Sequence, residues 1–247
     1  MFTPRLPALA LLACLSPSPS QALVGESAKG GVMEPHVLMV LTSRPAGAGF
    51  CTGVVISKDV ILTAAHCVAS LAQTRVLIKQ GEAMTFIEPG AVAIHPDYRA
   101  QAPRTRERSI DLALIKTARQ LPDGLKPVAL DERAPQPGAR YGVAGFGVTK
   151  EGVGSSGGVL HSGELRAREP MSKILLWAED PRGKGFGVCE GDSGGPIFTL
   201  DTSSLIAITS WSAGDGKTRC GQLTQAALIA PQRGWIAGVL RGWGLKP

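Results

Sequence analysis

The sequence predicts an all-β fold, a sandwich or a barrel, with one helix near the C-terminus. Its apolar segments are short, most of them about four to six residues long, and rich in Val, Ile and Leu. Turn residues recur between these segments, and the 31 Gly and 18 Pro of the chain supply the turns that such a fold needs. The predicted strands cover residues 37–41, 53–56, 75–78, 112–115, 174–177, 196–198 and 205–210.

The first 22 residues resemble an export signal. Arg5 gives a positive start, residues 6–15 form an apolar run too short to span a bilayer, and Ser20-Gln21-Ala22 offers a small-x-small cleavage site. We therefore expect a signal peptide over residues 1–22 and a secreted or periplasmic mature chain over residues 23–247. An alternative stays open, because the residues before Cys14 resemble a lipoprotein cleavage site, and Cys14 would then be lipidated.

Helical spacing is clear in one place, over residues 231–240. Trp235, Ile236, Val239 and Leu240 recur there at helical spacing, and Gly242 follows as a terminator. A short helical turn is expected after His66. The Gly- and Ser-rich residues 152–158 predict a mobile loop.

The charge and the cysteine content limit the functions that the chain could have. The net charge is +6, but the cations are scattered and no nucleic-acid motif accompanies them, so no nucleic-acid partner is expected. No segment after the signal approaches the roughly 18 continuous apolar residues of a membrane span. Removal of Cys14 with the signal leaves four cysteines, and an even number in an exported protein predicts two disulfides.

The strongest chemical motif is Gly-Asp-Ser-Gly-Gly-Pro at residues 191–196. A nucleophilic serine must stand clear of its backbone in a tight turn, which the glycines flanking Ser193 permit. Such a turn also exposes the N–H groups of Gly191 and Ser193. Two N–H groups aimed at one point can hold the negative oxygen of a tetrahedral intermediate, so these residues are the predicted oxyanion hole.

A serine hydroxyl needs a base, and His66 is the candidate. Histidine suits this role because its usual pKa is about 6.5. His66 adjoins Cys67, and a disulfide between Cys51 and Cys67 would hold the turn of the base against the preceding strand, contributing about 3 kcal/mol. Asp111 opens an apolar run, so it enters the core, where a carboxylate needs a partner such as an imidazole N–H.

These three motifs, in the order His66, Asp111, Ser193, resemble those of trypsin- and chymotrypsin-like serine proteases. Weaker matches agree, among them Ile94-His95-Pro96-Asp97-Tyr98 and Gly145-Phe146-Gly147. The resemblance implies two six-stranded antiparallel β-barrels with the catalytic triad in the cleft between them, and a disulfide between Cys189 and Cys220. It implies a serine endopeptidase that forms an acyl-enzyme, with polypeptide substrates and protein inhibitors as partners, no metal or other cofactor, and a monomeric state.

The resemblance also implies an activation device. In this family a new N-terminus folds inward, and its ammonium group pairs with the Asp that precedes the catalytic Ser. Leu23-Val24-Gly25-Glu26 resembles the family's N-terminal sequence, and Asp192 is the matching acid. Signal cleavage after Ala22 would itself release the amine of Leu23, so no separate zymogen is expected.

For the substrate, the resemblance places the base of the primary specificity pocket at Gly187, with Val188 beside it. An acidic residue at the Gly187 position marks trypsin-like preference, so its absence favours small or apolar side chains over Arg and Lys. Glu190 would bias the rim toward basic flanking residues, and Ser210, Trp211 and Ser212 resemble the strand that pairs with substrate. The alternative is a catalytically silent homologue that acts as a binding protein, although such proteins usually lose a triad residue.

Overall fold

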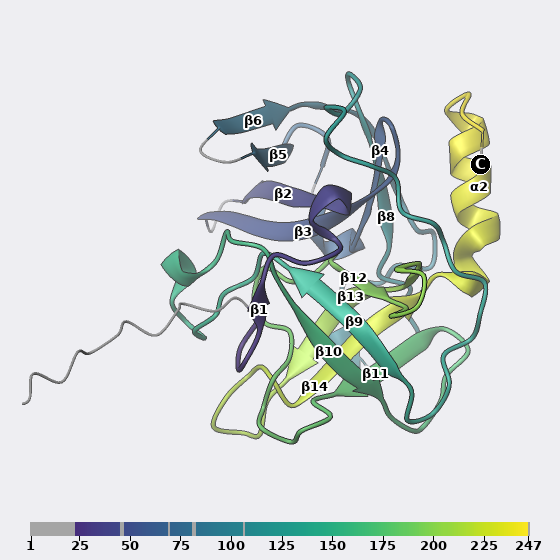
Figure 1. Ribbon diagram of the computed structural model, residues 1–247. Helices are drawn as coiled ribbons and strands as arrows, with labels where there is room; N and C mark the ends of the chain where they lie inside the picture. Colours follow the sequence, from purple (N-terminus) through teal and green to yellow (C-terminus); the bar gives the residue numbers. More distant parts are fainter. Residues whose placement is uncertain (1–22, 45–46, 69, 81–82, 106, 247) are drawn as a thin grey trace, which may run out of the picture.

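Two antiparallel sheets make up the protein, one above the other in Figure 1. The structure is a computed structural model of the 247-residue chain, and it describes residues 23–44, 47–68, 70–80, 83–105 and 107–246. The predicted signal peptide, with Cys14, lies outside the described residues. The first half of the described chain forms the upper sheet, and the second half forms most of the lower one.

The first sheet has seven strands in the order β6-β5-β2-β3-β4-β8-β7. Its end strands, β6 and β7, are not paired with each other among the described residues, so this sheet is a half-barrel. The strands are β2 (Val37–Arg44), β3 (Gly47–Ser57), β4 (Val60–Thr63), β5 (Thr74–Gln80), β6 (Ala83–Ile87), β7 (Pro89–Ile94) and β8 (Ala113–Thr117).

The second sheet closes on itself. Six strands follow one another as β10-β11-β14-β13-β12-β9, and the pairing of β9 with β10 completes the barrel. The two-residue strand β1 adds to the outside of β10. The strands are β1 (Ala28–Lys29), β9 (Arg140–Gly145), β10 (His161–Ala167), β11 (Leu175–Glu179), β12 (Pro196–Phe198), β13 (Leu205–Ala213) and β14 (Leu223–Leu228).

Each sheet encloses its own apolar core, which explains why the strands read as Val-, Ile- and Leu-rich segments. β4 lies between β3 and β8 and is buried along its whole length. Its Ile61 and Leu62 are 0% exposed and belong to the first core. Leu165 and Ile197 belong to the second. A strand buried on both faces needs no polar alternation, so short apolar runs are the expected pattern.

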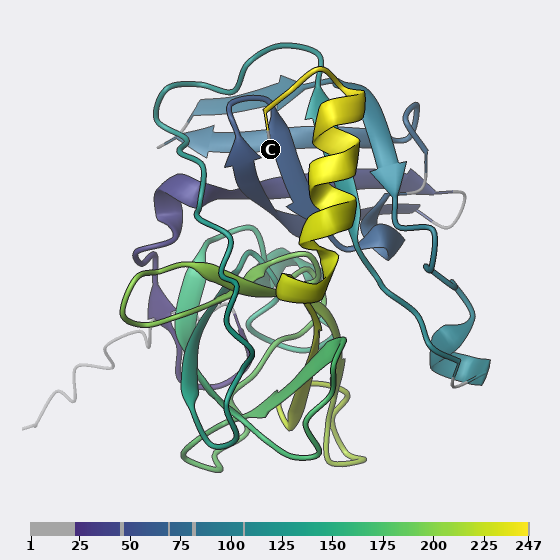
Figure 2. The same ribbon diagram turned by 90° about the vertical axis from the view of Figure 1, so that its right-hand side faces the viewer.

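The C-terminal helix α2 (Arg233–Gly242) follows the last strand of the second sheet but packs against the first. Its buried Ile236 and Leu240 join the first core, and Figure 2 shows the yellow helix running upward along that sheet. The remaining helical elements are short: α1 (Ala102–Thr105) and the 3-10 turns η1 (Glu34–His36), η2 (Ala65–Cys67), η3 (Gly154–Ser156) and η4 (Ala230–Gln232).

The predicted fold class is confirmed. The chain is mostly β, has one closed six-stranded barrel and one half-barrel, and ends in a helix. One detail differs from the sequence prediction, since the helical turn contains His66 rather than following it. The Gly- and Ser-rich loop holds the 3-10 turn η3, whose Ser156 hydroxyl donates to the Val153 carbonyl at 2.6 Å, and its mobility stays a prediction. Among the described residues, no helix is both long and apolar enough to cross a membrane.

Candidate active site

His66 lies in η2, directly after β4. Its neighbour Cys67 forms a disulfide with Cys51 of β3, and their Cα atoms are 6.1 Å apart. This is the pair expected from the sequence. Because β3 and β4 are adjacent in the sheet, the disulfide fixes the turn that carries His66 to the strand beside it.

Asp111 reaches His66 because of the register of the first sheet. β8 pairs with β4 so that Ala113 lies opposite Thr63, which brings the residues just before β8 next to those just after β4. Asp111 Oδ2 accepts a hydrogen bond from His66 Nδ1 at 2.7 Å, and its Oδ1 accepts the backbone N–H of His66 at 2.9 Å. A carboxylate that grips both the ring and the backbone of one histidine fixes the orientation of that ring.

A third donor completes the surroundings of Asp111. The Ser210 hydroxyl of β13 donates to Oδ2 at 2.6 Å, so the second sheet also holds this carboxylate. Burial alone would raise the pKa of Asp111, but the hydrogen bonds and charge of His66, with the Ser210 hydroxyl, outweigh it and hold this pKa below its usual value. Asp111 is therefore ionised at neutral pH. An ionised acceptor requires that His66 Nδ1 carry a proton, which leaves Nε2 of the neutral ring as the acceptor.

Ser193 lies in a turn that packs directly on β3 and β4, the strands that precede the His66 turn. Its carbonyl accepts the N–H of Thr52 in β3 at 2.8 Å and lies 3.7 Å from the Sγ of Cys67. Gly194 has a φ of +83°, and a Cβ added there would overlap the Thr52 carbonyl and the Thr63 hydroxyl. Only glycine allows the turn of the predicted nucleophile to approach the base this closely.

The Ser193 turn carries the groups that could act on a substrate. Among the described residues, the Ser193 hydroxyl and the N–H groups of Gly191 and Ser193 have no hydrogen-bond partner. Gly191 has a φ of +96°, and its carbonyl is held by the Thr52 hydroxyl at 2.9 Å. In free enzymes catalytic hydrogen bonds are often long, and they tighten when substrate binds.

Asp192 is fully buried beside this turn. Its carboxylate accepts the N–H groups of Gly147 at 2.8 Å and Cys189 at 2.9 Å, and a Cβ at Gly145 or Gly147 would overlap it. Burial raises the pKa of Asp192 to about 7, which the two hydrogen bonds only partly offset. In the described part of the chain this carboxylate has no cationic partner, so its charge is costly.

Leu23 is 0% exposed and lies in the core of the second barrel with Phe186. Its neighbour Val24 bridges to Gly187, whose N–H donates to the Val24 carbonyl at 3.1 Å. The residues just after the predicted cleavage site are therefore folded into the barrel, beside the predicted pocket.

The predicted pocket base is apolar. Gly187 is buried, and a Cβ there would lie 3.0 Å from the Cα of Gly221, so a larger residue would need the backbone of Gly221 to shift by a few tenths of an ångström. Val188 is 2% exposed and belongs to the second core. The second predicted disulfide, between Cys189 and Cys220, is formed and holds the adjoining segments together.

Glu190, which was expected to bias the rim of the pocket toward basic flanking residues, has a cationic partner in this protein. Its carboxylate pairs with the guanidinium of Arg219 at 2.9 Å, which compensates its charge. Trp211 is 47% exposed, and it and Ser212 pair with Gln225 and Thr224 of β14.

The other edge of this strand is open. β12 pairs only with residues 205–208 of β13, so Ser210, Trp211 and Ser212 extend past it. Among the described residues no strand pairs with that edge. An open strand edge can bind an extended peptide as one more strand.

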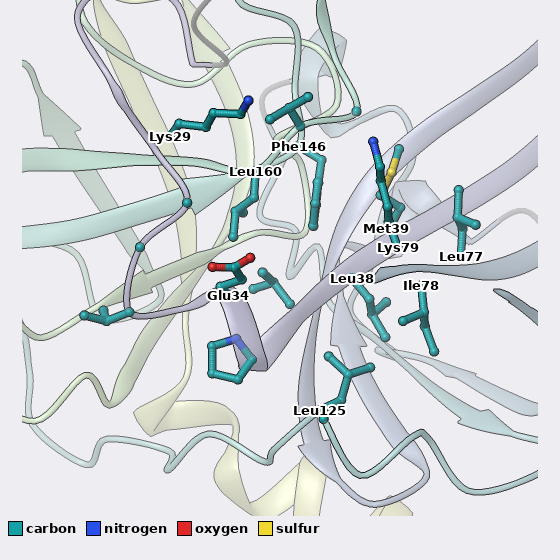
Figure 3. Close-up of a pocket in the computed structure, with 18 residues that line it drawn as sticks. Lys29, Glu34, Leu38, Met39, Leu77, Ile78, Lys79, Leu125, Phe146 and Leu160 are labelled. Atoms are coloured by element: carbon teal, nitrogen blue, oxygen red, sulfur yellow. The ribbon is translucent and has the colours of Figure 1, made fainter. Parts of the chain in front are cut away.

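Two further features, a cavity and a group of potential metal ligands, do not add to the candidate site. A cavity of about 850 Å³ lies between the two sheets, and Figure 3 shows Leu38, Leu125, Phe146 and Leu160 spread around it. None of the predicted site residues lines this cavity. Donor atoms of Cys51, His66 and Cys67 lie within 4.8 Å of one another, but both sulfur atoms belong to the disulfide and are not thiolate ligands.

Some contacts and residues of the site were missed from the sequence. Ser210 was expected in the strand that pairs with substrate, which stays a prediction, but the contact of its side chain with Asp111, 99 positions away, was missed. The buried Asp180 was not singled out; it accepts the N–H groups of Arg182, Lys184 and Phe186 and so shapes the loop before Gly187. Its position ahead of a Pro-Arg-Gly run was the available signal, since Asp often accepts the N–H groups of a following turn.

Comparisons with known proteins agree with this geometry. The family model described as Trypsin matches residues 23–236. "Trypsin epsilon" of Drosophila erecta is 27% identical over 76% of this chain and 77% of its own length. The "Trypsin-like protease" of Streptomyces glaucescens is 31% identical over 69% and 67%, and human "Kallikrein-10" is 31% identical over 77% and 74%.

A solved structure supports the same fold. The chain titled neuropsin, a serine protease expressed in the limbic system of mouse brain, aligns with a TM-score of 0.71 and 23% identity. The alignment covers 87% of this chain and 99% of that one.

Proposed function

This chain belongs to the trypsin family of serine endopeptidases, and we propose that it hydrolyses peptide bonds with Ser193 as nucleophile, His66 as general base and Asp111 orienting the base. The observation that carries the assignment is the grip of Asp111 on His66, at 2.7 Å to the ring and 2.9 Å to the backbone. The turn that carries Ser193 is held against β3 by the hydrogen bond from the Thr52 N–H to the Ser193 carbonyl. Members of the family are hydrolases, and this chain keeps the residue types that the chemistry needs.

The proposed reaction follows from the tautomer that Asp111 selects. Nε2 of His66 takes the hydroxyl proton of Ser193 as its Oγ forms a bond to the substrate carbonyl carbon. The carbonyl oxygen becomes an oxyanion, which the free N–H groups of Gly191 and Ser193 stabilise. The imidazolium then gives its proton to the leaving amine, the peptide C–N bond breaks, and an acyl-enzyme remains. Water then gives a proton to His66 Nε2 as its oxygen forms a bond to the acyl carbon. The ester bond to Ser193 Oγ breaks, Oγ takes the proton back from His66, and the acid is released.

Substrate would bind along the open edge of β13. Main-chain groups of Ser210, Trp211 and Ser212 beyond β12 can pair with an extended polypeptide, as in β-strand addition. Since Glu190 is paired with Arg219, we propose that it frames the rim rather than attracting basic residues. Protein inhibitors would bind the same edge as substrates do.

We propose a preference for small or apolar side chains at the residue before the scissile bond. The base at Gly187 and Val188 carries no fixed charge, so a Lys or Arg side chain would lose its hydration there without gaining a partner. Cleavage of a peptide library by the purified mature protein, read by mass spectrometry, is expected to yield cuts mainly after Ala, Val, Leu and aromatic residues. The Ser193→Ala variant, which lacks the proposed nucleophile, is the control for cleavage that does not come from this site. A profile dominated by Arg and Lys would contradict this preference, and no cleavage at all by the native chain would contradict the endopeptidase assignment.

Activation is proposed to follow export directly. Release of Leu23 by signal cleavage would create an α-ammonium group next to a segment that is already buried in the barrel. Within the described ranges, the buried Asp192 has no cationic partner, so pairing with this ammonium group would remove the cost of burying its charge. The two disulfides fit an oxidising compartment, and we therefore propose a secreted or periplasmic, monomeric enzyme.

A further inference from the structure

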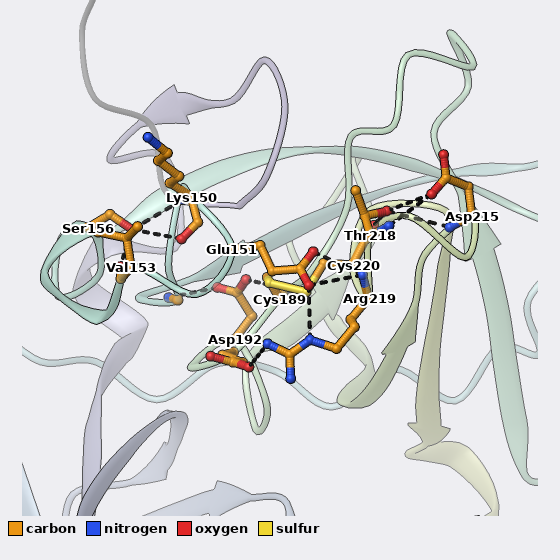
Figure 4. Close-up of a disulfide and its surroundings, with 12 residues drawn as sticks. Lys150, Glu151, Val153, Ser156, Cys189, Asp192, Asp215, Thr218, Arg219 and Cys220 are labelled. Carbon is orange, nitrogen blue, oxygen red and sulfur yellow. Dashed lines mark hydrogen bonds and ion pairs between the residues drawn. A yellow bond between two sulfur atoms is a disulfide. The ribbon is translucent and has the colours of Figure 1, made fainter.

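Arg219 stands at the meeting point of three loops near the proposed catalytic centre. It precedes Cys220, and Figure 4 shows its side chain beside the Cys189–Cys220 disulfide and Glu151. Its Nε donates to Glu151 Oε1 at 2.9 Å, and its Nη2 donates to Glu190 Oε1 at 2.9 Å. One guanidinium thus binds two carboxylates that are 39 positions apart in the chain.

The contact with Glu151 has more hydrogen bonds than a single surface ion pair. Besides the side-chain bond, the backbone N–H of Arg219 donates to both carboxylate oxygens of Glu151, at 2.9 and 3.1 Å. The Glu151 side chain is 24% exposed although Arg219 is 70% exposed. Isolated surface pairs contribute little, but a forked arrangement with a network of acceptors holds its geometry better.

The disulfide already joins two of these loops, because Cys189 adjoins Glu190 and Cys220 adjoins Arg219. Among the described residues, no covalent bond joins the third loop, which carries Glu151, to the other two. That third loop matters for the chemistry, since the Val148 N–H donates to the Glu190 carbonyl at 2.8 Å and the Gly147 N–H donates to Asp192. Its position therefore bears on residues 190–193, which hold the proposed oxyanion donors.

We propose that Arg219 is a positioning residue that fixes the Glu151 loop and the Glu190 loop around the oxyanion turn. The inference rests on the proposed function, because it concerns the geometry of the Gly191 and Ser193 N–H groups in the transition state. Arg219 contacts neither the reacting atoms nor the triad. Misplacement of oxyanion donors lowers the rate of the chemical step more than it weakens ground-state binding.

The test compares Arg219→Ala and Arg219→Lys with Arg140→Ala. The control removes an exposed Arg of the same barrel that pairs with Glu164 at 3.3 Å, away from the three loops. Active enzyme is first counted by fluorophosphonate titration, and kcat and KM are then measured on one peptide substrate. We expect Arg219→Ala to lower kcat about tenfold with KM changed less than threefold, Arg219→Lys to recover part of the loss, and Arg140→Ala to match the native enzyme.

Two further measurements keep the proposal testable should Arg219→Ala fold poorly. Glu151→Gln is expected to lower kcat similarly, and the Arg219→Ala, Glu151→Gln double variant to lose little more than the worse single variant. Raising the ionic strength to about 1 M, where the Debye length is about 3 Å, should lower native kcat toward that of Arg219→Ala. If the native enzyme is not titrated, the proposed function fails. If it is titrated and both Arg219→Ala and Glu151→Gln keep kcat within twofold of Arg140→Ala, this inference alone is overturned.

Discussion

Replacing Ser193 with alanine is expected to lower kcat by about 10⁶-fold, the loss typical of a Ser-His-Asp site that loses its nucleophile. The proposed mechanism needs the Ser193 hydroxyl to form the acyl-enzyme, and no other described hydroxyl lies in that glycine-flanked turn. His66→Ala should cost about as much, because an unassisted hydroxyl is a poor nucleophile. The measurement is hydrolysis of a chromogenic peptide by each purified variant.

The double variant gives a sharper result than either single one. Ser193 and His66 act as a unit, so removing both is expected to cost no more than removing one. His36→Ala is the matched control, since His36 Nδ1 donates to the Lys126 carbonyl and lies outside the site. Additive losses from Ser193→Ala and His66→Ala, or an equal loss in His36→Ala, would contradict the assigned roles.

The second large effect concerns Asp192. A rise of its pKa from 3.8 to about 7 corresponds to about 4 kcal/mol for keeping the charge buried without a partner. This raised pKa stabilises the folded chain below pH 3.8, and the contribution is lost as pH rises toward 7. A chain with extra residues before Leu23 should therefore lose stability over that range. The mature chain should keep its stability, because in the proposed scheme its ammonium group would pair with Asp192. Urea unfolding of both chains at pH 5 and pH 8 measures this difference.

The same pair should govern activity. Asp192→Asn in the mature enzyme is expected to lower kcat by about 10²- to 10³-fold, the range for losing an oxyanion donor, since the proposed ion pair between residue 192 and the Leu23 ammonium group would be lost. The proposed pairing would raise the pKa of the Leu23 amine above its usual 7.7–8.0, so activity should be lost as pH rises through that raised value. Asp123→Asn, at an exposed position, is the control. Full activity from an acetylated N-terminus, or a mature protein that begins elsewhere, would rule out this activation scheme.

The sequence was sufficient for those parts of the fold that depend on local pattern. Short Val-, Ile- and Leu-rich runs predicted the strands, and the spacing of Trp235, Ile236, Val239 and Leu240 predicted the helix that became η4 and α2. Local sequence pattern could not predict barrel closure. The pairing of β9 with β10 and the open end between β6 and β7 depend on long-range register. Register is set by packing and turn geometry, which no single segment encodes.

The residues of the candidate site likewise fall into those that local motifs predict and those that depend on tertiary contacts. Glycines beside Ser193 and a cysteine beside His66 have recognisable local meaning, so those residues were predictable. Arg219 was not, because it is an exposed cation whose partner Glu151 lies 68 positions away. Asp180 shows the same limit, since its acceptor role appears only when the following loop folds over it. Charged residues gain their function here from tertiary neighbours rather than from spacing.

The most direct test of the central claim is covalent labelling of the folded mature enzyme with a fluorophosphonate, followed by peptide mass spectrometry. An activated serine attacks the phosphorus, fluoride leaves, and one adduct remains on the oxygen. The account predicts a single adduct on Ser193, absent from Ser193→Ala and strongly slowed in His66→Ala. A native enzyme that acquires no adduct, as a catalytically silent homologue would, or one labelled on another serine, would contradict it.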